Sequence, residues 1–518
     1  MPRLPLLGGA YEAQSIIANA QRCINLYPEV NPTNTQAPVP VTHYPTPGKT
    51  QISAGFGPGR GNFTASDGTA YGVSGSTLYW FGVDGQPQIL GTISNLATPV
   101  RWVDNSLELL VLDGAANGAW TIDLPTKVLT RKEDFGGTTG AYLDTFAIVN
   151  VLDTKEFTVS EPNSFIFPGD IGSKTAAPDQ LAAVMTVRRE LWLIGKKSTE
   201  IWTTVPDVDF PFQIIPGAFI EYGSAAPYSI VTADISLFWL GQNEEGQGMV
   251  MRGKGYEVKK ISTFAIDSML QGYSTLTDAQ AYSYQENGHV FFVLNFPTAD
   301  QTWVFDESTD AWHQRSWMDQ DGYLHRDRLC SNITAYGKRW GQDWETGALY
   351  EVGVAITTDN GMPILRLRSF PHLPTTMIAG SGSLGLDGKR LKYHKFMADM
   401  EVGTEEETSL PLQLYDSALL QETSSEILLD PNSYSLLLDY GGLNGVPGPR
   451  VLLRWSNTRG ASWQGSLSQS LGSAGQYNTQ PAWQRLGMAR DRIWELSWVT
   501  RGKTALNGAW VKFTHMKS

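Results

Sequence analysis

Two short stretches hold residue types that perform phosphate chemistry in other proteins. Residues 195–199 read Gly-Lys-Lys-Ser-Thr, but a phosphate-binding loop also needs a glycine where Glu190 stands and a following helix. Residues 325–327 read His-Arg-Asp, as in a kinase catalytic loop. No asparagine follows them at the required offset, and no Gly-rich nucleotide loop precedes them. We therefore expect residues 195–199 to form a hairpin turn and predict no nucleotide chemistry at either stretch.

Metal and nucleophile chemistry has equally little support. The seven His residues are dispersed, and Cys23 and Cys330 lie far apart, so no metal-ligand spacing is present. We expect two free thiols in a protein made in a reducing cytosol. A Ser-His-Asp triad assembles in space and is left open by sequence, but no Gly-x-Ser-x-Gly elbow in a strand-to-helix context supports one. We predict no catalytic residues, no cofactor and no metal.

One stretch points toward carbohydrate-binding propellers. Residues 456–463 read Ser-Asn-Thr-Arg-Gly-Ala-Ser-Trp and resemble the Asp-box turn of sialidases. Ser456, Gly460 and Trp463 match the box, but Thr458 replaces its aspartate. We expect these residues to form a structural β-hairpin turn.

A glycan-cleaving enzyme would also need two carboxylates roughly 5 to 10 Å apart. Asp207, Asp209 and Glu221 are candidates, but nothing in the sequence marks any two of them as a pair. Clustered arginines for a substrate carboxylate are not visible either.

Composition predicts a chain of many short strands. The 518 residues include 52 Gly and 28 Pro together with 17 Trp, 20 Tyr and 20 Phe, a mixture of turn formers and large β-favouring side chains. No run of eighteen apolar residues predicts a membrane span, and the apolar region at the N-terminus is too short for a secretory signal.

The charge argues against tight nonspecific DNA binding. It is 39 − 52 = −13, whereas such binding needs a basic surface. A channel through which DNA slides remains compatible with this charge, because an acidic or neutral wall would not hold the DNA. The simpler interpretation is a soluble acidic protein.

From about residue 55, hairpin-like units recur. The steps between the prominent residues of their second strands are 41, 37, 45, 48, 53 and 47. Antiparallel repeats of roughly 40 to 50 residues are typical of a β-propeller, here with six or seven blades, although the irregular spacing leaves a sandwich open. We expect Trp202, Trp239 and Trp303 in the core. The seven marker residues are Tyr79, Trp120, Phe157, Trp202, Val250, Trp303 and Tyr350.

We divide the all-β chain into an extended N-terminal arm (1–54), a β-propeller (55–359) and a C-terminal β-sandwich-like platform (360–518) that packs with the arm. Recurrent prolines keep the arm extended, and only residues 12–20 suit a helical turn. Its apolar side chains favour capture by a neighbour over a free tail. The arm residues that we predict at an interface are Leu4, Leu6, Leu7, Tyr11 and Tyr27.

The connector 206–227 is unusually apolar. Its four prolines forbid a regular helix, so we expect a loop that is buried or held against a partner chain. We interpret it as the seam between domains or as a constriction of a channel. The residues that we predict at this interface or channel are Phe210, Phe212, Phe219 and Tyr222.

Several long segments, in order, resemble the packaged-DNA stabilisation proteins of short-tailed phages, the tail hub or nozzle subunits. They include LWLIGKKSTEIW, FPFQIIPGAFIEYGSAAPYS, LFWLG and GYEVKKIST. The opening PLLGGAYEAQSIIANAQRCINLYPEVNP and the closing YNTQPAWQRLGMARDRIWELS extend the resemblance toward both ends of the chain.

The resemblance implies a non-enzymatic virion protein of the phage tail, assembled in the host cytoplasm. It implies a homo-hexameric ring below the portal and its adaptor, which extends the DNA conduit, stabilises the packaged genome and anchors spikes or fibres. DNA would pass without sequence-specific binding, and no membrane insertion is expected. The alternatives are a receptor- or glycan-binding tail component and a glycan-cleaving propeller enzyme.

Overall fold

The computed structural model shows a chain built almost entirely of β-strands. Among the residues that it describes there is one α-helix, α1 (Phe264–Gly272). The described residues are 3–4, 6, 8–15, 19–31, 39–116, 118–132, 135–207, 210–242, 246–319, 321–371, 390–403, 449–472, 475–500 and 502–515.

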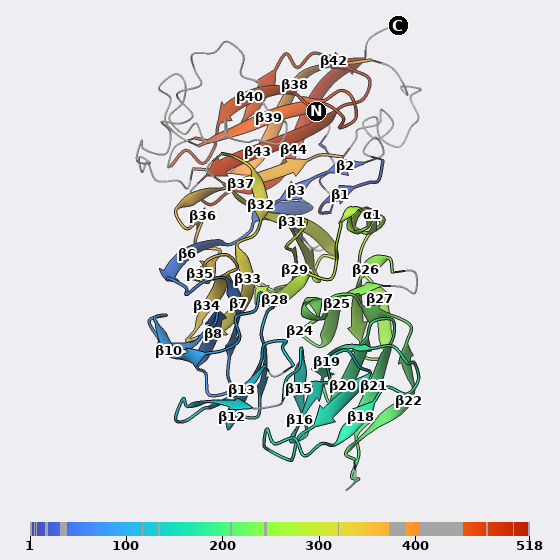
Figure 1. Ribbon diagram of the computed structural model, residues 1–518. Helices are drawn as coiled ribbons and strands as arrows, with labels where there is room; N and C mark the ends of the chain where they lie inside the picture. The colour runs from blue at the N-terminus through green and yellow to red at the C-terminus, as the bar shows by residue number, and fades with distance from the viewer. Residues whose placement is uncertain are drawn as a thin grey trace.

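Seven units follow one another around a ring, which confirms the predicted β-propeller and sets the number of blades at seven (Figure 1). Each has four strands, except that the inner strand of blade five is in two pieces, β23 and β24. In each blade the first strand lies innermost and the sheet meanders outward. Blade one is β7 (Gly59–Thr64), β8 (Ala70–Ser74), β9 (Thr77–Phe81) and β10 (Pro87–Thr92). Blade two is β11 (Arg101–Asp104), β12 (Glu108–Leu112), β13 (Ala119–Asp123) and β14 (Leu129–Lys132). Blade three is β15 (Gly140–Leu143), β16 (Phe146–Asn150), β17 (Glu156–Val159) and β18 (Ile171–Ser173).

The remaining blades carry the variations of the fold. Blade four is β19 (Leu181–Val187), β20 (Glu190–Gly195), β21 (Thr199–Thr204) and β22 (Phe212–Ile220). Blade five is β23 (Gly223–Ser224) and β24 (Val231–Ala233), then β25 (Ser236–Gln242), β26 (Gly248–Lys254) and β27 (Glu257–Lys260). Blade six is β28 (Gln280–Glu286), β29 (His289–Phe296), β30 (Gln301–Asp306) and β31 (Ala311–Met318), with β32 (Leu324–Arg326) beside it. Blade seven is β33 (Leu329–Ala335), β34 (Lys338–Asp343), β35 (Leu349–Gly353) and β6 (Gly48–Ser53).

Local sequence explains the hairpins. The turn between β28 and β29 is Asn287–Gly288, with φ of 50° and 83°. Both residues therefore take the left-handed conformation that a tight two-residue hairpin requires and that Asn-Gly tolerates best. Between such turns, apolar residues are buried on both faces of each blade. The predicted core residues Trp202, Trp239 and Trp303 are buried, because each sheet packs against two neighbours.

The N-terminal segment closes the ring. β6 pairs antiparallel with β35 and becomes the outer strand of blade seven, although it lies about 300 residues earlier in the chain. The division at residue 55 stays a prediction, but this pairing joins residues 48–53 to the propeller sheet. At the two ends of the range 12–20, which suits a helical turn, residues 11–12 and 20–21 form the paired strands β1 (Tyr11–Glu12) and β2 (Ala20–Gln21).

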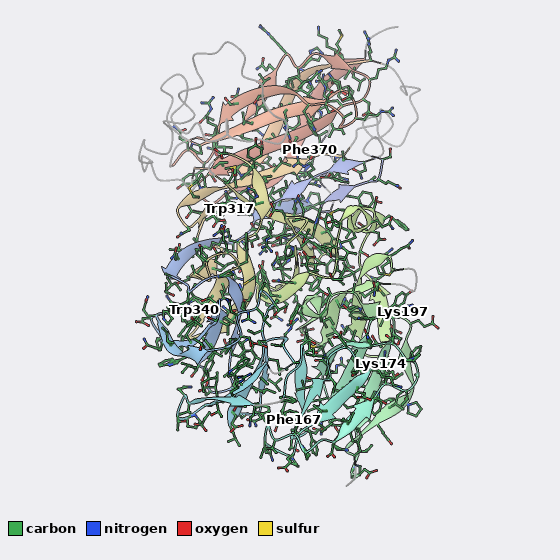
Figure 2. The ribbon with its side chains drawn as sticks, viewed as in Figure 1. Phe167, Lys174, Lys197, Trp317, Trp340 and Phe370 are labelled. Carbon is green, nitrogen blue, oxygen red and sulfur yellow. The ribbon has the colours of Figure 1, made fainter. Side chains whose placement is uncertain are left out.

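The C-terminal unit is a sandwich of two sheets, and the N-terminal strands run through it (Figure 1). One sheet contains β4 (Leu26–Val30), β5 (Val41–Pro45), β44 (Ala505–His515), β38 (Leu391–Glu401), β41 (Ala482–Gln484) and β42 (Met488–Ala489). The other contains β3 (Cys23–Ile24), β37 (Met362–Ser369), β43 (Ile493–Thr500), β39 (Arg450–Ser456) and β40 (Gln464–Ser470), and β36 (Thr358–Asp359) joins it to blade seven. Phe396 packs on Trp494 across the two sheets, with ring centroids 5.0 Å apart. Phe370, which is labelled in Figure 2, packs against Phe396.

Candidate functional site

The seam between the propeller and the C-terminal unit is built around β3. This strand lies between β31 of blade six and β37, parallel to the first and antiparallel to the second. Asn25, directly after it, donates hydrogen bonds to the carbonyl oxygens of Ser316 (3.0 Å) and Leu365 (2.8 Å). Its side-chain oxygen accepts from the Ser316 N–H at 3.0 Å. One buried amide therefore ties blade six to the sandwich.

A buried ion triad reinforces the seam at blade seven. The Lys49 ammonium on β6 lies 2.6 Å from Asp327 and 3.0 Å from Asp359 on β36. Burial disfavours charge on all three groups, yet ion pairing raises the pKa of Lys49 and lowers that of Asp327. Burial, with repulsion from Asp327, holds the pKa of Asp359 above its usual value. The triad is stable only when intact, because a buried charge without its partner is costly.

Three histidines gather where the hairpin β4–β5 packs on blade six. The His289 imidazole lies 2.7 Å from the Asp306 carboxylate, and this hydrogen bond raises the pKa of His289 against the effect of burial. His313 is fully buried, and neither ring nitrogen has a hydrogen-bond partner. Burial lowers the pKa of His313 to about 4. His43 is also buried, and burial lowers its pKa well below the usual value.

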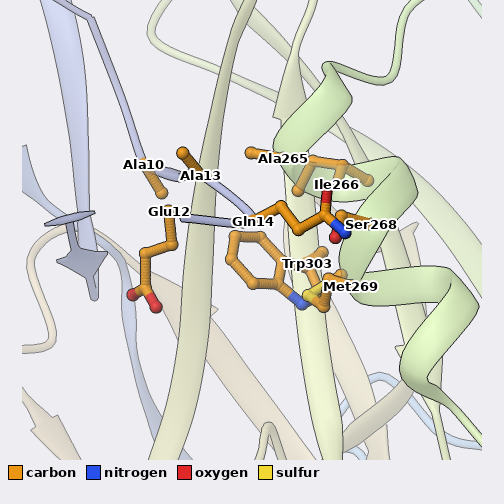
Figure 3. A pocket seen from close by; sticks show the side chains of 9 residues that line it. All are labelled: Ala10, Glu12, Ala13, Gln14, Ala265, Ile266, Ser268, Met269 and Trp303. Carbon is orange, nitrogen blue, oxygen red and sulfur yellow. The ribbon is translucent and has the colours of Figure 1, made fainter. Parts of the chain in front are cut away.

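A shallow pocket lies beside the seam, between the N-terminal segment and α1 (Figure 3). It has a volume of about 220 Å³, and its apolar lining includes Trp303, Met269 and Ile266. Its single carboxylate, Glu12, lies 3.6 Å from Arg22. Burial raises the pKa of Glu12, with Arg22 opposing the shift. Among the described residues that line the pocket, Glu12 alone has an acidic or basic side chain, so the lining brings no pair of such groups together.

The predicted interface residues of the arm lie largely inside the chain. Leu4, Leu6 and Tyr27 are buried in its own core, and Tyr11 is half-buried on β1. Leu7 lies outside the described residues. Capture of the arm therefore takes place within one chain, and contacts of these residues with a ring neighbour or an adaptor stay a prediction.

The connector 206–227 is not a loop throughout, and that expectation was wrong. Residues 212–220 form β22, the outer strand of blade four. Pro216 is exposed near the middle of this edge strand, where its missing N–H leaves no ladder hydrogen bond unmade. The pairing with β21 shifts register between Glu200 and Trp202, which accommodates the irregular stretch around Pro216.

The predicted residues of this connector divide by exposure. Phe212 is buried against Phe146 and Phe210 within the propeller. Phe219 is 40% exposed, and Phe210 and Tyr222 are half-buried. Of the four, Phe219 is the one whose side chain is free to contact another molecule, and the interface or channel role of all four stays a prediction.

The Gly-Lys-Lys-Ser turn binds an anion that belongs to the chain itself. The Asp179 carboxylate accepts hydrogen bonds from the N–H groups of Lys197 (2.8 Å) and Ser198 (3.2 Å) and from the Ser198 hydroxyl (2.7 Å). The ammonium of buried Lys174, which is labelled in Figure 2, lies 2.7 Å from the same carboxylate. Burial raises the pKa of Asp179, but these hydrogen bonds outweigh burial and hold the pKa below its usual value. The turn is therefore occupied and structural.

Residues 456–463 lie in the connection between β39 and β40. The Ser456 hydroxyl accepts hydrogen bonds from the N–H groups of Thr458 (3.3 Å) and Gly460 (2.8 Å). Thr458, at the place of the aspartate, accepts from the Ser462 N–H at 2.8 Å. Trp463 stacks under the Arg454 guanidinium, 4.9 Å from its ring centroid. These contacts are internal to the hairpin.

The candidate carboxylates do not meet. Asp207 and Glu221 flank β22, whose two ends pair with Thr204 and Thr199 of β21, five steps apart and therefore about 17 Å at roughly 3.3 Å per residue. This separation is far beyond the range of a glycosidase pair, and Asp209 lies outside the described residues. Within those residues no group of three or more His, Cys, Asp or Glu is placed to hold a metal ion. In the same part of the chain, no helix has the length and hydropathy of a membrane span.

Sequence reasoning missed a contact at the centre of the propeller. The inner strand of blade five is interrupted by the 3₁₀-helix η2 (Pro227–Ser229). Arg101 of blade two donates to the carbonyl oxygens of Pro227 (3.4 Å) and Ile230 (3.2 Å), and its guanidinium lies 5.7 Å from the Tyr228 ring centroid. Because blades two and five are not neighbours in the ring, this contact crosses its centre. The Ala-Ala-Pro-Tyr stretch gave no periodic signal of this packing.

Solved structures resemble this chain at low sequence identity. The extracellular domain of a hybrid two component system from B. thetaiotaomicron matches with 10% identity and a TM-score of 0.40. The match covers 67% of this chain but only 43% of that one. Virginiamycin B lyase from Staphylococcus aureus has 9% identity and a TM-score of 0.39, over 59% of this chain and 97% of its own. The Neurospora crassa Pan2 WD40 domain has 12% identity and a TM-score of 0.36, and the match covers 59% of this chain and 95% of that domain.

Sequence comparison identifies the family to which this chain belongs. No curated protein matches the chain significantly. The family described as bacteriophage P22 Gp10, β-propeller, a phage stabilisation family, matches residues 2–351. This range covers the N-terminal strands and nearly all of the seven blades. The chain therefore belongs to the phage stabilisation family of the P22 Gp10 β-propeller.

Proposed function

We propose that this chain is the tail hub or nozzle subunit of a short-tailed phage. In this proposal six copies form a ring below the portal and its adaptor, extend the DNA conduit, retain the packaged genome and anchor spikes or fibres. The observation that carries the proposal is the family match over residues 2–351, which includes the strands that lock the propeller to the sandwich.

The packing supports a structural role. The propeller, the N-terminal strands and the sandwich share one continuous hydrophobic core, from Phe238 of blade five to Trp494 of β43. Such a core makes a stiff subunit, which suits a part that must hold its shape under load. The contact of Arg101 with η2 occupies the centre of the propeller, so the proposed DNA path runs between subunits and not along a propeller axis.

The mass of the purified chain tests the ring. Light scattering is measured on the chain alone and on the chain mixed with the adaptor protein of the same phage. We expect a hexamer, either alone or on the adaptor ring. A chain that stays monomeric under both conditions and is missing from purified virions would refute the proposal.

The outer edge of blade four is our candidate ring contact. Phe219→Asp places a charge on the exposed part of β22, and we expect it to weaken ring formation while the melting temperature of the monomer is retained. Phe212→Asp is not a suitable test, because Phe212 is buried and its replacement would unfold the blade. Gln213→Asp is the matched control on the same strand, since Gln213 is exposed but polar.

A further inference from the structure

One face of the propeller is formed by the turns between the first and second strands of each blade and, in blades one to six, by the turns between the third and fourth strands. Because every blade meanders outward from the axis, these two kinds of turn end on the same side. We call it the turn face. Its described residues are 65–69, 82–86, 105–107, 124–128, 144–145, 160–170, 188–189, 205–207, 210–211, 234–235, 255–256, 287–288, 307–310 and 336–337.

Bonds between neighbouring blades show that these turns share one face. Lys127 of blade two lies 2.8 Å from Asp67 of blade one. Arg189 of blade four lies 2.7 Å from Asp144 of blade three. Between blades four and five, the Tyr256 hydroxyl donates to Glu190 at 2.7 Å. Such cross-blade bonds hold the tips at fixed positions, and a pre-ordered surface loses little entropy on binding.

Large apolar side chains project from the tips of these turns. Hairpin turns ordinarily carry Gly, Asn, Asp, Ser and Pro, and a single exposed apolar residue needs no explanation. Here seven of them, up to Val83 at 73% exposed, stand on one face of one domain. They are Val83, Leu107, Val128, Ile166, Ile235, Tyr256 and Tyr336. Apolar and aromatic anchors on a rigid support are what a protein interface uses.

The charge of the turn face indicates which kind of molecule can bind there. Its described turns hold nine carboxylates and three basic side chains, so the net charge is 3 − 9 = −6. Nucleic acid and anionic lipid are repelled by such a face. A second copy presenting the same face would be repelled as well. A protein with lysines or arginines around apolar pockets is attracted.

We propose that the turn face is a docking surface for a different protein of the particle, one that presents a basic, apolar-pocketed surface. The proposal rests on virion membership from the proposed function. Beyond the proposed function, the inference states which side of the propeller is covered in the particle and what chemistry the covering protein has.

Cysteine labelling in the assembled particle tests whether the face is covered. Val83→Cys and Val128→Cys are compared with Leu96→Cys, which is 39% exposed in the link on the opposite face; the wild-type chain gives the background. Maleimide should label the two turn-face cysteines at least about tenfold more slowly in virions than in the free chain, whereas the Leu96→Cys rate is unchanged. Equal rates for Val83→Cys and Val128→Cys in virions and in the free chain would overturn the proposal.

Carbodiimide cross-linking tests the chemistry of the partner. The reagent joins a carboxylate to a lysine in direct contact, and we expect cross-links from Asp84 or Glu161 to lysines of another virion protein, identified by mass spectrometry. Links to a second copy of this chain, or none in virions that contain it, would contradict the proposal alone. If the chain is absent from virions, both the proposed function and this inference are refuted.

Discussion

The seam and the turn face use the same chemistry for different ends. Both bring lysines and arginines to carboxylates from separate strands, but the seam buries them and the turn face leaves them in contact with water. Lys49 and its two carboxylates are nearly inaccessible, whereas Lys127 and Asp67 keep 24% and 32% of their side-chain surface exposed. A buried ion pair therefore has a large effect on the stability of the chain, because breaking it leaves a charge without a partner in the interior. An exposed ion pair contributes little stability and mainly holds the surface turns in place.

Breaking the seam triad should have the largest effect. Lys49→Met leaves two buried carboxylates without the ammonium that pairs with both of them, and we expect a loss of about 3–5 kcal/mol in the free energy of unfolding, measured by urea denaturation at pH 7. Lys338→Met is the matched control, because Lys338 pairs with Glu351 at 2.9 Å on the exposed surface. A Lys49→Met chain as stable as the control would show that the seam does not depend on the triad.

Acid should weaken the seam through its buried histidines. Because the pKa of His313 falls to about 4 in the folded chain, the folded chain does not take up the proton that the unfolded chain binds near pH 6.5. The stability that His313 contributes is intact above that pH and is lost as the pH falls toward 4. Between pH 7.5 and pH 5 the loss is about 2 kcal/mol. His313→Phe should be less sensitive to acid by about this amount, measured by urea denaturation at both pH values.

The groups around His313 set the details of this titration. Asp306 on β30 favours its protonation, whereas His289 on β29 opposes it. His43 on β5 faces Arg368 and His313, and its lowered pKa also makes the free energy of unfolding fall in acid. The raised pKa of His289 has the opposite effect and favours the folded chain in acid. His394→Asn is the control, since His394 is bonded to Thr514 at the surface. Equal acid sensitivity of His313→Phe and wild type would exclude His313 as the source.

Removing an ion pair from the turn face should lower the free energy of unfolding least. Lys127→Met removes the ion pair with Asp67 and a hydrogen bond to the Tyr71 hydroxyl (2.7 Å). We expect a loss of about 0.5–1 kcal/mol in unfolding free energy that shrinks in 1 M salt, because exposed pairs are screened. A salt-independent loss as large as that of Lys49→Met would erase the distinction between the two regions.

Much of the fold was predictable because the signals are local. Alternating apolar residues and aromatic markers placed a hairpin in every blade, and the predicted turn at residues 195–199 lies where β20 and β21 reverse direction. The connector 206–227 was misinterpreted because proline counts against a central strand but is tolerated on an outer edge, and position in the sheet is not a local property. Capture of Leu4 and Leu6 was predicted, but apolar side chains do not specify whether the capturing surface belongs to the same chain.

The sequence by itself determined a hairpin in every blade, the propeller repeat, the C-terminal sandwich and the absence of a recognisable nucleotide motif at residues 195–199. The tertiary structure decided the number of blades, the closure by β6, the partner of the Gly-Lys-Lys-Ser turn and the meeting of Lys49 with Asp327 and Asp359. Each of these depends on residues brought together from distant parts of the chain. Their pairing is set by how whole sheets pack, and no local pattern of residues records it.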